Sequence, residues 1–436
     1  MVSSRTLERL TLLGFAWFFA STLAAQTPVG GVDTLTLEQA IAEALDHNLG
    51  LIAERYNLSI AQARIITARL RPNPVFSLDG DHLPLAGTHF NAVNMAGPPE
   101  YAARTDFVLE RGEKRKARIA VAESSRAVAE LQLLNTVRGV VLEVQSTLVD
   151  LLAAKDSLRL AQENLATLNE IVRINTTRVK DGDVSEVELL RAQVASLQFE
   201  NQVHQAETRL ATTRAKLQVL LGRTRTARPF DIAGELRRTT APLSEQTLLE
   251  TARQRRPDLL ALVRDQARSL ADLRNQIAIG TVDYTVGSEF RRQQGLAGTG
   301  NSLGFFFSTS LPVFNRNQGE IERASQEQRQ IAARIRALQA TVENEVEIAY
   351  LTYANSRATL ERIESTMLTR ARDVRSITEY SYKRGEASFV EFFDAQRAYN
   401  DTIQTYNDAR AEYARALYTI DAATGTNVID RKGPQP

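Results

Sequence analysis

The sequence predicts a mainly α-helical protein with a smaller β part, built from one structural unit that occurs twice. The first observation is a repeated stretch: Lys180–Gln193 and Lys383–Gln396 share seven of fourteen positions, where chance gives roughly one. The second is that each stretch lies between two long helical segments without proline. The third is that each half of the chain carries a pair of alternating segments typical of β-strands.

The repeated stretch is typical of a tight turn between two antiparallel helices. A helix often ends at a glycine in the left-handed conformation, and the next helix begins at a serine whose side chain caps its first turn. A glutamate three residues after that serine completes a capping box. Both copies have this order: Gly182, Ser185 and Glu188 in the first, and Gly385, Ser388 and Glu391 in the second. The sequence therefore predicts two long helical hairpins with the same tip.

The composition excludes several classes of function. Of 436 residues, 53 are basic and 52 acidic, so the net charge of +1 gives no electrostatic reason to expect nucleic acid. Cysteine is absent, which excludes disulfides, a thiolate metal site and a lipid anchor on cysteine. The four histidines are scattered, and no zinc-binding or phosphate-binding motif occurs. We therefore expect neither an enzyme nor a cofactor.

The first 25 residues are expected to be a cleaved secretory signal. Arg5 and Arg9 precede an apolar run from Leu10 to Ala20, and small residues follow up to Ala25. A retained membrane anchor is the alternative, but a run of about eleven residues is too short to span a bilayer. No later segment has the uncharged length of a membrane-spanning helix, so a membrane role requires β-strands.

The first repeat is expected over residues 26–221 and begins with two short helices. Pro72 and Pro74 end the second helix near Arg71, because proline cannot continue it. The remaining elements are strands at about 75–80 and 104–111 with a loop at 81–103 between them, a long helix from Gly112 to Lys180, a tip at about 182–185 and a helix that returns to about Leu221.

The second repeat is expected over residues 244–424, after a linker at 222–243 and before a tail at 425–436. Its beginning, Ser244–Glu250, echoes Leu37–Glu43 of the first repeat. Its further elements are strands at about 281–290 and 303–312, a Gly-rich loop at 291–301, a long helix, a tip at about 385–388 and a helix that returns to about Ala423.

Apolar residues recur every seven positions in both long helices, which predicts coiled-coil packing. In the first helix the repeated positions are Val137, Val144, Leu151, Leu158, Leu165, Val172 and Val179. In the second they are Val346, Tyr353, Leu360, Met367 and Val374.

The tips, the Asn-Pro after the first helices, the paired strands and the duplicated plan resemble the TolC-type outer membrane efflux proteins. The resemblance covers nearly all of the chain after residue 25, and the run Leu109–Ile119 is similar to the heavy-metal (CzcC-like) branch. It implies a homotrimer whose chains together form a twelve-stranded outer membrane barrel and an α-helical tunnel through the periplasm. It also implies a passive exit duct for an inner-membrane pump, reached through a periplasmic adaptor, with no chemistry of its own.

Physical reasoning agrees with a barrel closed by three chains. Four strands cannot close a barrel, and an open sheet edge in lipid leaves backbone groups unpaired. Twelve strands can close, and roughly ten residues per strand suffice to cross an outer membrane. The apolar faces of the strands would then meet lipid, while Asp79, Asp283, Thr285 and Glu289 would face water.

Glu391 and Asp394 are the main candidates for a selective site. They lie three residues apart on one helical face, where like charges repel mildly, whereas Glu188 and Arg191 at the first tip attract. In the resembling family, acidic residues at the Glu391 and Asp394 positions line the periplasmic constriction, and a threefold axis would turn them into rings that select cations. The alternative is that Glu391 only caps its helix and Asp394 is a solvated charge.

The resemblance also assigns roles to Tyr382 and to the tips. Tyr382 matches a tyrosine that helps to close the inner hairpin, so it joins Glu188, Glu391 and Asp394 as a constriction residue. The family's usual arginine past the tip glycine is replaced here by Ala387, and Arg384 is the candidate substitute. The adaptor is expected to dock on the tips, although these residues can also serve only to cap and pack the turns. The docking candidates are Gly182, Ser185, Val187, Gly385, Ser388 and Val390.

Two other functions fit part of these observations. The same channel could serve drugs or type I secretion of a polypeptide, since three Met and no Cys provide no soft-metal motif. A periplasmic coiled-coil scaffold or adaptor is the alternative of another class, and the alternating strands disfavour it. The expected location is the outer membrane, with most of the mass in the periplasm, after Sec export and without a lipid on cysteine.

Overall fold

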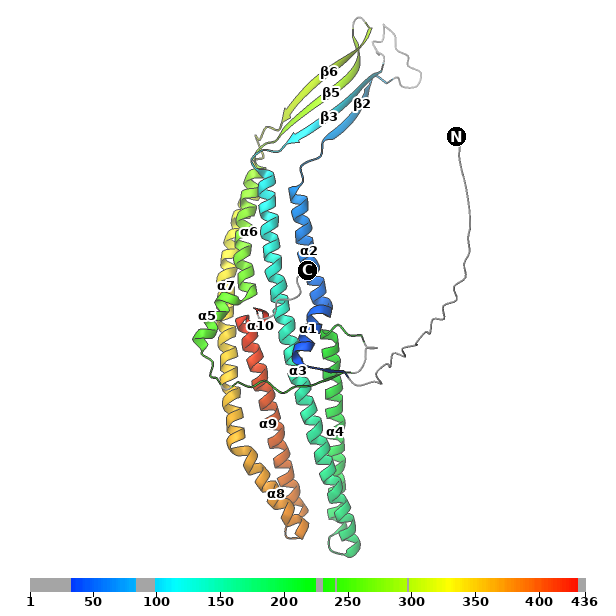
Figure 1. The fold of residues 1–436 in the computed structure, drawn as a ribbon, viewed down its shortest axis with the longest axis vertical. Helices are drawn as coiled ribbons and strands as arrows, with labels where there is room; N and C mark the ends of the chain where they lie inside the picture. The colour runs from blue at the N-terminus through cyan, green and yellow to red at the C-terminus, as the bar shows by residue number, and fades with distance from the viewer. Residues whose placement is uncertain (1–32, 84–98, 225–229, 240, 296–297, 430–436) are drawn as a thin grey trace, which may run out of the picture.

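The computed structural model describes residues 33–83, 99–224, 230–239, 241–295 and 298–429 of the chain. In this part the molecule is a long rod, with a β-sheet at one end and two helical tips at the other (Figure 1). None of the described helices is long and apolar enough to cross a membrane. The expected signal, most of the loop between the first two strands and the last seven residues lie outside the described residues.

The first half of the chain folds into two short helices, two strands and one long hairpin. Thr36 caps the first helix and Asn48 the second, each with its side-chain oxygen on a backbone N–H of the first turn. The elements are α1 Leu37–His47, α2 Leu49–Arg69, β2 Val75–Asp81, β3 Glu100–Leu109, α3 Lys114–Asp181 and α4 Glu186–Leu220.

The second half repeats this order, which confirms the mainly helical fold class and the duplicated unit. Its elements are α5 Glu245–Arg255, α6 Pro257–Ile279, β5 Tyr284–Gly295, β6 Gly298–Thr309, α7 Gln318–Arg362, the π-helix η1 Ile363–Met367, α8 Leu368–Arg384 and α9 Phe389–Thr424. A last short helix, α10 Thr426–Ile429, forms where a tail was expected.

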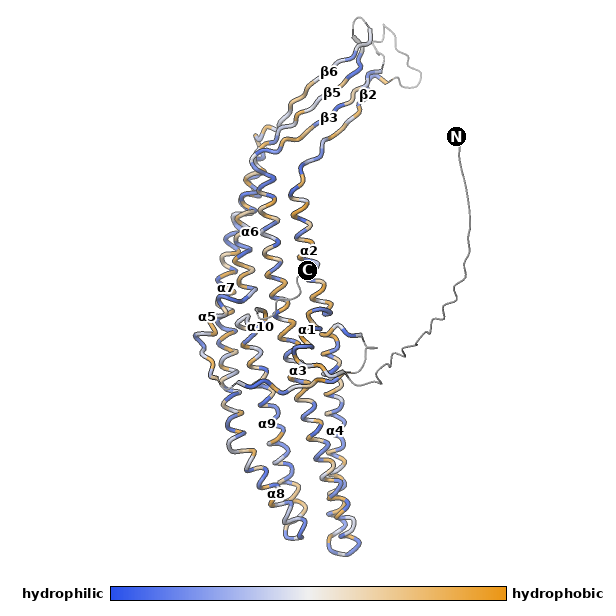
Figure 2. The backbone as a smooth tube through the Cα atoms, in the orientation of Figure 1, coloured by the Kyte–Doolittle hydropathy of each residue, from blue (hydrophilic) through white to orange (hydrophobic). Residues whose placement is uncertain are grey.

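The four long strands form one antiparallel sheet in the order β2-β3-β5-β6. Hydrophobic and hydrophilic residues alternate along these strands (Figure 2). By register, one face carries the apolar side chains Phe76, Leu78, Tyr101, Phe107, Tyr284, Val286, Phe290, Leu303, Phe305 and Phe307. The opposite face carries the polar side chains Asp79, Asp81, Glu100, Arg104, Asp106, Thr285, Glu289 and Arg291. The strands β2 and β6 are the two open edges of this sheet.

The strands are longer toward the distal end of the sheet than the sequence predicted. The loop prediction 81–103 is wrong over residues 100–103, which belong to β3, and the predicted loop 291–301 is mostly β5 and β6. Glycine and charged residues weaken the strand signal there, yet cross-strand pairing continues, with Arg292 opposite Asn301. At the helical end the strands stop two to three residues before the predicted limits 111 and 312.

The expected linker forms part of a belt around the middle of the rod. Its strand β4, Phe230–Ile232, pairs in parallel with β1, Asp33–Leu35. Phe230 and Ile232 are buried in one apolar cluster with Ile41 of α1. The linker and the first helix are therefore held on the same side of the long hairpin.

The linker then crosses to the second hairpin and contacts it at successive residues. Leu236 is buried against that hairpin, and Arg237 forms an ion pair with Asp421. Arg238 binds Glu364 of η1 at 2.8 Å, and the backbone oxygen of Thr239 accepts a hydrogen bond from Tyr413. The belt thereby connects both hairpins at mid-length, visible as the dark green segment in Figure 1.

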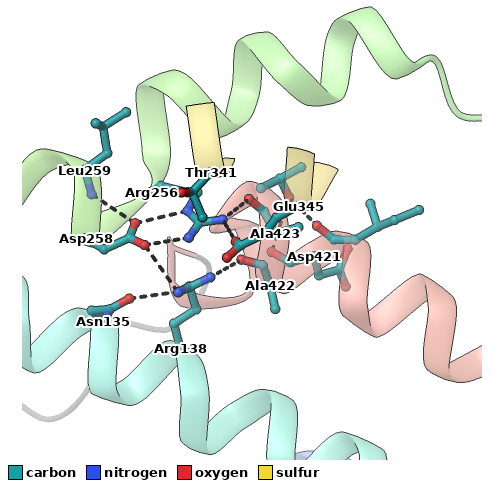
Figure 3. A network of polar contacts seen from close by, with 12 residues as sticks. Asn135, Arg138, Arg256, Asp258, Leu259, Thr341, Glu345, Asp421, Ala422 and Ala423 are labelled. Carbon is teal, nitrogen blue, oxygen red and sulfur yellow. Dashed lines mark hydrogen bonds and ion pairs between the residues drawn. The ribbon is translucent and has the colours of Figure 1, made fainter. Parts of the chain in front are cut away.

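A buried arginine network joins the helices α3, α6, α7 and α9 (Figure 3). The Arg256 side chain is almost fully buried and donates to both oxygens of Asp258, at 3.0 and 2.5 Å, and to Glu345. Arg138 of α3 binds Asp258 at 3.5 Å and donates to the backbone oxygen of Ala422 at 2.8 Å. The Ala422 and Ala423 carbonyls at the end of α9 thus receive cationic donors, in addition to the capping bond from the Gly425 N–H to Ala422.

The predicted seven-residue pattern of the second long helix is wrong after the π-helix η1, which interrupts it. Val346, Tyr353 and Leu360 are buried as predicted, but Met367 and Val374 are 42% and 54% exposed. A π-turn absorbs one extra residue in a helix, so the inward positions resume eight residues after Leu360 rather than seven. The inward-facing series after the π-helix is half-buried Leu368, half-buried Arg375 and buried Tyr382.

Candidate functional site: the hairpin tips

Both hairpins turn at a glycine, as the sequence predicts. Gly182 has a φ of 82° and Gly385 a φ of 81°, in the left-handed region that side chains with a Cβ rarely adopt. A Cβ added at either position would meet no atom within 4 Å. The requirement for glycine is therefore the backbone conformation itself and not a lack of space.

The two tips are capped differently. At the second tip Glu391 Oε2 accepts from Ser388 N at 2.7 Å and from Ser388 Oγ at 2.9 Å, while Ser388 Oγ accepts from Glu391 N, which completes the capping box. At the first tip Ser185 Oγ accepts from Glu188 N at 3.4 Å, but the reciprocal bond is missing. The predicted capping box at Glu188 is therefore wrong.

Glu188 instead reaches the other hairpin through Tyr382. The Tyr382 hydroxyl donates to Asn175 Oδ1 at 2.7 Å and lies 3.5 Å from Glu188 Oε1. The Tyr382 side chain is only 1% exposed, and its ring stacks on Phe392 with centroids 5.2 Å apart. Burial raises the pKa of Tyr382, so the hydroxyl stays protonated and remains a donor.

Arg178 provides a second connection between the hairpins. It donates to the backbone oxygen of Lys383 at 2.7 Å and to that of Tyr382 at 3.4 Å, at the carbonyl end of α8. Arg384 stacks over Tyr380 at 4.5 Å, so within one copy it is Arg178 that bonds to the other hairpin, and the substitution of Arg384 for the family arginine stays a prediction. A cation near the last carbonyls of a helix is favourable, which explains the position of Arg178.

Glu391 and Asp394 are both exposed one turn apart at the start of α9. The hydrogen bonds from Ser388 lower the pKa of Glu391, so its carboxylate keeps its negative charge to a lower pH than an ordinary glutamate does. Asp394 has no ion-pair partner in the part of the chain that the structure describes. Nor is the predicted Glu188–Arg191 attraction present as an ion pair there. Among the described residues, Glu391 and Asp394 at the second tip thus have no cationic side chain as a partner.

An apolar groove separates α4 from the start of α9. Its volume is 390 Å³, and Val187 and Val390 at its mouth are 56% and 46% exposed. These two docking candidates therefore share one surface. The other lining residues are Leu190, Arg191, Val194, Ala195, Gln198, Phe389 and Phe393.

Sequence reasoning missed the amides buried between the hairpins. Asn175 is fully buried, and farther from the tip the Gln396 amide donates to Asn164 at 3.2 Å and to Asn400 at 3.0 Å. Amides at apolar positions of a coiled coil are a recognisable sequence signal, because they fix the register of the packed helices at some cost in stability. Asn164 and Asn175 lie among the predicted apolar repeats of α3 and could have been found in this way.

Within the described residues of one copy, no three His, Cys, Asp or Glu side chains are arranged to hold a metal ion. Each copy carries three exposed carboxylates at the second tip, those of Glu386, Glu391 and Asp394. A site with more oxygen ligands therefore requires further copies of the chain.

A family model described as "Outer membrane efflux protein" matches residues 40–223 and 248–426, one match for each half of the chain. The chain belongs to this family. The TolC-type resemblance is thereby confirmed, and with it an outer membrane efflux channel of a tripartite system. The family consists of ducts rather than enzymes, and its members work with an adaptor and an inner-membrane pump.

Similar proteins include other efflux components. The chain is 24% identical over 394 residues to the cobalt-zinc-cadmium resistance protein CzcC of Cupriavidus metallidurans, with 90% of each chain covered. Its fold is similar to that of CusC, with a TM-score of 0.73, 19% identity, and 89% and 92% of the two chains covered. The Campylobacter jejuni outer membrane channel CmeC has a TM-score of 0.74 at 15% identity, with 96% and 94% covered.

Proposed function

We propose that three copies of this outer membrane efflux protein form an exit duct whose periplasmic end is a cation-selective ring. The observation that carries the proposal is the pair of carboxylates, Glu391 and Asp394, at the tip of the second hairpin, which have no cationic side chain as a partner among the described residues. The ring requires several copies of the chain around one axis.

The two open edges of the sheet support a trimer. In hydrocarbon, the backbone groups along the free edges of β2 and β6 need partners from another copy. Three four-stranded sheets give twelve strands, enough to close a barrel with an aqueous lumen, whereas one copy cannot close. The polar face of the sheet then surrounds the lumen and the apolar face meets lipid.

Exposed apolar rows on the helices support the same assembly. Val263, Leu270 and Ile277 of α6 recur every seven residues and are partly exposed. A row with this spacing favours packing against another helix, and within one copy this row is left partly uncovered. We assign these faces to the neighbouring copies.

A threefold axis through the tips would bring three Glu391 and three Asp394 side chains together. Rings of carboxylates favour cations and can bind divalent ions. Glu391 keeps one oxygen atom outside its capping bonds, so capping and ring functions are compatible. The contacts of Tyr382 and Arg178 hold the second hairpin against the first and would keep this ring narrow.

We assign divalent metal cations as the client because the relative CzcC is named for resistance to cobalt, zinc and cadmium. The hairpin tips would receive the periplasmic adaptor, with the groove at Val187 and Val390 as its apolar contact. We further propose export by the signal in residues 1–25, no lipid on cysteine, and the domain limits 26–221 and 244–424 given above.

The test is single-channel conductance in planar bilayers for the wild type and for Glu391→Ala/Asp394→Ala, with and without a divalent cation. We expect small cation-selective currents that the divalent ion blocks, and loss of this block in the double variant. The matched control is Asp183→Ala/Glu186→Ala, which removes two exposed carboxylates from the first tip and should retain the block. Block unchanged in Glu391→Ala/Asp394→Ala would reject the ring, and absence of currents from inserted trimers would favour a scaffold. Selectivity for drugs or polypeptides over cations would support the rival clients.

A further inference from the structure

The basic run Leu109–Ile119 divides into two groups of side chains. In the first group Lys116 pairs with Glu113 at 3.3 Å, Lys114 forms an ion pair with Asp283 at 2.7 Å, and Arg118 pairs with Glu110. The last two contacts join the end of the sheet to the start of α3. Arg111 and Arg115 are exposed, and among the described residues neither has a carboxylate within ion-pair distance. This second group has no carboxylate partner: Arg111 stacks on an aromatic ring, and Arg115 donates to a backbone oxygen at the end of α2.

Arg111 lies at the helical end of the apolar face of the sheet. Its guanidinium stands 4.2 Å from the centre of the Tyr284 ring, and Tyr284 in turn packs on Phe307 at 5.2 Å. Tyr284 shares the apolar face with Val286 and Phe290 by the alternation of β5. Through this ring contact, the Arg111 guanidinium lies at the helical end of the apolar face of the sheet, which is the face that meets lipid.

A second tyrosine–arginine pair bounds the same face at its distal end. Tyr101 lies directly opposite Arg292 in the register of β3 and β5, and both are exposed. Tyr284 to Arg292 spans about nine residues, the length of a tilted strand that crosses the hydrocarbon core. Tyrosines prefer the boundary between hydrocarbon and headgroups, so Arg111 lies at the headgroup level of the leaflet nearer the helices.

We propose that Arg111 and Arg115 bind the phosphate of an anionic phospholipid in the leaflet on the helical side. Tyr284 positions the Arg111 guanidinium, which can offer a planar pair of N–H donors to phosphate oxygens. The Nε of Arg115 donates to the backbone oxygen of Arg69 at 2.7 Å, which leaves its terminal N–H groups available. The site needs only an outer membrane location and does not depend on conduction.

Native mass spectrometry of the detergent-purified assembly tests this binding, with phosphatidylglycerol as the probe and phosphatidylcholine as the uncharged comparison. Each basic residue at a membrane surface contributes about a five-fold gain in affinity for anionic lipid, so Arg111→Gln should weaken phosphatidylglycerol binding about five-fold. Arg111→Gln/Arg115→Gln should weaken it about twenty-five-fold. Phosphatidylcholine binding should not change.

The matched control is Arg336→Gln/Arg372→Gln, which removes two exposed arginines from α7 and α8, away from the sheet. It should bind phosphatidylglycerol like the wild type. Arg111→Lys keeps the charge and should give intermediate affinity, which covers the case in which Arg111→Gln does not fold. Equal lipid binding by the Arg111 variants and the control would overturn the proposal. Loss of assembly in Arg111→Lys without loss of lipid affinity would assign Arg111 to a contact between copies.

Tyr284→Trp tests the position of the site in the bilayer. The only tryptophan of the sequence, Trp17, lies in the expected leader. Once the leader is removed, all tryptophan fluorescence therefore comes from the new residue at position 284. Lipids brominated near the headgroup end of the acyl chain should quench it more than lipids brominated near the chain terminus. No quenching by either lipid would show that another copy covers this face and would overturn the site.

Discussion

The hydroxyl of Tyr382 donates a 2.7 Å hydrogen bond to Asn175, a residue 207 positions away in the other hairpin. Both side chains are buried, and the two halves of the duplicated chain meet here at the end of the rod. The Nδ2 atom of Asn175 has no hydrogen-bond partner among the described residues, so the Tyr382 hydroxyl is an important polar partner of this amide. Loss of that hydroxyl leaves a buried amide oxygen dependent on water.

Tyr382→Phe should separate the hairpin tips more easily. Removing one partner of a buried hydrogen bond costs about 1–3 kcal/mol, so the open form should gain population. We expect larger single-channel conductance and faster proteolysis of the tips than in the wild type.

Tyr380→Phe is the control for this variant, because Tyr380 is two residues away, exposed, and keeps its ring under Arg384 after the change. It should behave like the wild type. Equal conductance of Tyr382→Phe and Tyr380→Phe would show that the Tyr382 hydroxyl does not hold the tips together.

Ser388→Ala should make cation selectivity more sensitive to acid. The bonds from Ser388 lower the pKa of Glu391, so the charge and the cap are complete at neutral pH and are lost as the pH falls through this lowered pKa. Without the Ser388 hydroxyl the pKa of Glu391 rises toward its ordinary value, and the charge is lost at a higher pH. The measurement is the reversal potential in a salt gradient between about pH 6 and pH 3.

Ser185→Ala is the matched change at the first tip, where the serine hydroxyl accepts only from the Glu188 backbone. Its selectivity should follow the wild-type pH dependence. Superimposable pH curves for Ser388→Ala and the wild type would mean that Glu391 does not contribute to selectivity.

Deletion of Ser365 should be tolerated although it lies inside a helix. Ser365 is an exposed residue of η1, and removal of one residue from a π-turn restores a regular α-helix without rotating the residues beyond it. Tyr382 should therefore still face Asn175. We expect little change in the unfolding temperature of the assembly in detergent.

Deletion of Gln162 is the comparison, since this exposed residue lies in the corresponding part of α3, where the helix is regular. It rotates the following residues by about 100° and turns the buried side chains outward. This variant should fail to assemble. If the two deletions had the same effect on assembly and on the unfolding temperature, η1 would not be a π-turn that accommodates one extra residue.

Arg256→Ala should destabilise the middle of the rod strongly. It leaves Asp258 with fewer partners in a buried site, and breaking such a pair typically costs about 3–5 kcal/mol. Arg253→Ala removes a nearby arginine whose ion pair with Glu343 is 56% and 47% exposed, and should cost about 0–1 kcal/mol. Thermal unfolding measures the stability of both variants. Similar losses of stability in the two would show that the buried contacts of Arg256 contribute no more than the exposed ion pair of Arg253.

The sequence predicted the parts of this fold that depend on local physical chemistry. Gly182 and Gly385 end helices because of backbone conformation, and Ser388 caps through its immediate neighbours. The heptad positions Val144 and Leu151 are buried, since apolar spacing determines which side of a helix packs.

What the sequence did not predict depends on contacts between distant segments. The π-helix η1 has no local signal of its own and shows only as exposed Met367 and Val374. Arg178 and Asn175 find their partners about two hundred residues away, so spacing along the chain did not reveal them. The duplication was also misleading in one respect, because Glu188 and Glu391 occupy equivalent positions but bind different groups.

The two free edges of the sheet have a consequence for how this protein reaches its working state. A solitary copy in the bilayer would expose the amide and carbonyl groups of β2 and β6 to hydrocarbon, at a cost of several kcal/mol for each unpaired group. The helices, by contrast, satisfy their own backbone groups before any partner arrives. We therefore expect the helices to fold first and the strands to enter the bilayer only as copies come together. Dilution should accordingly arrest maturation at a water-soluble helical intermediate.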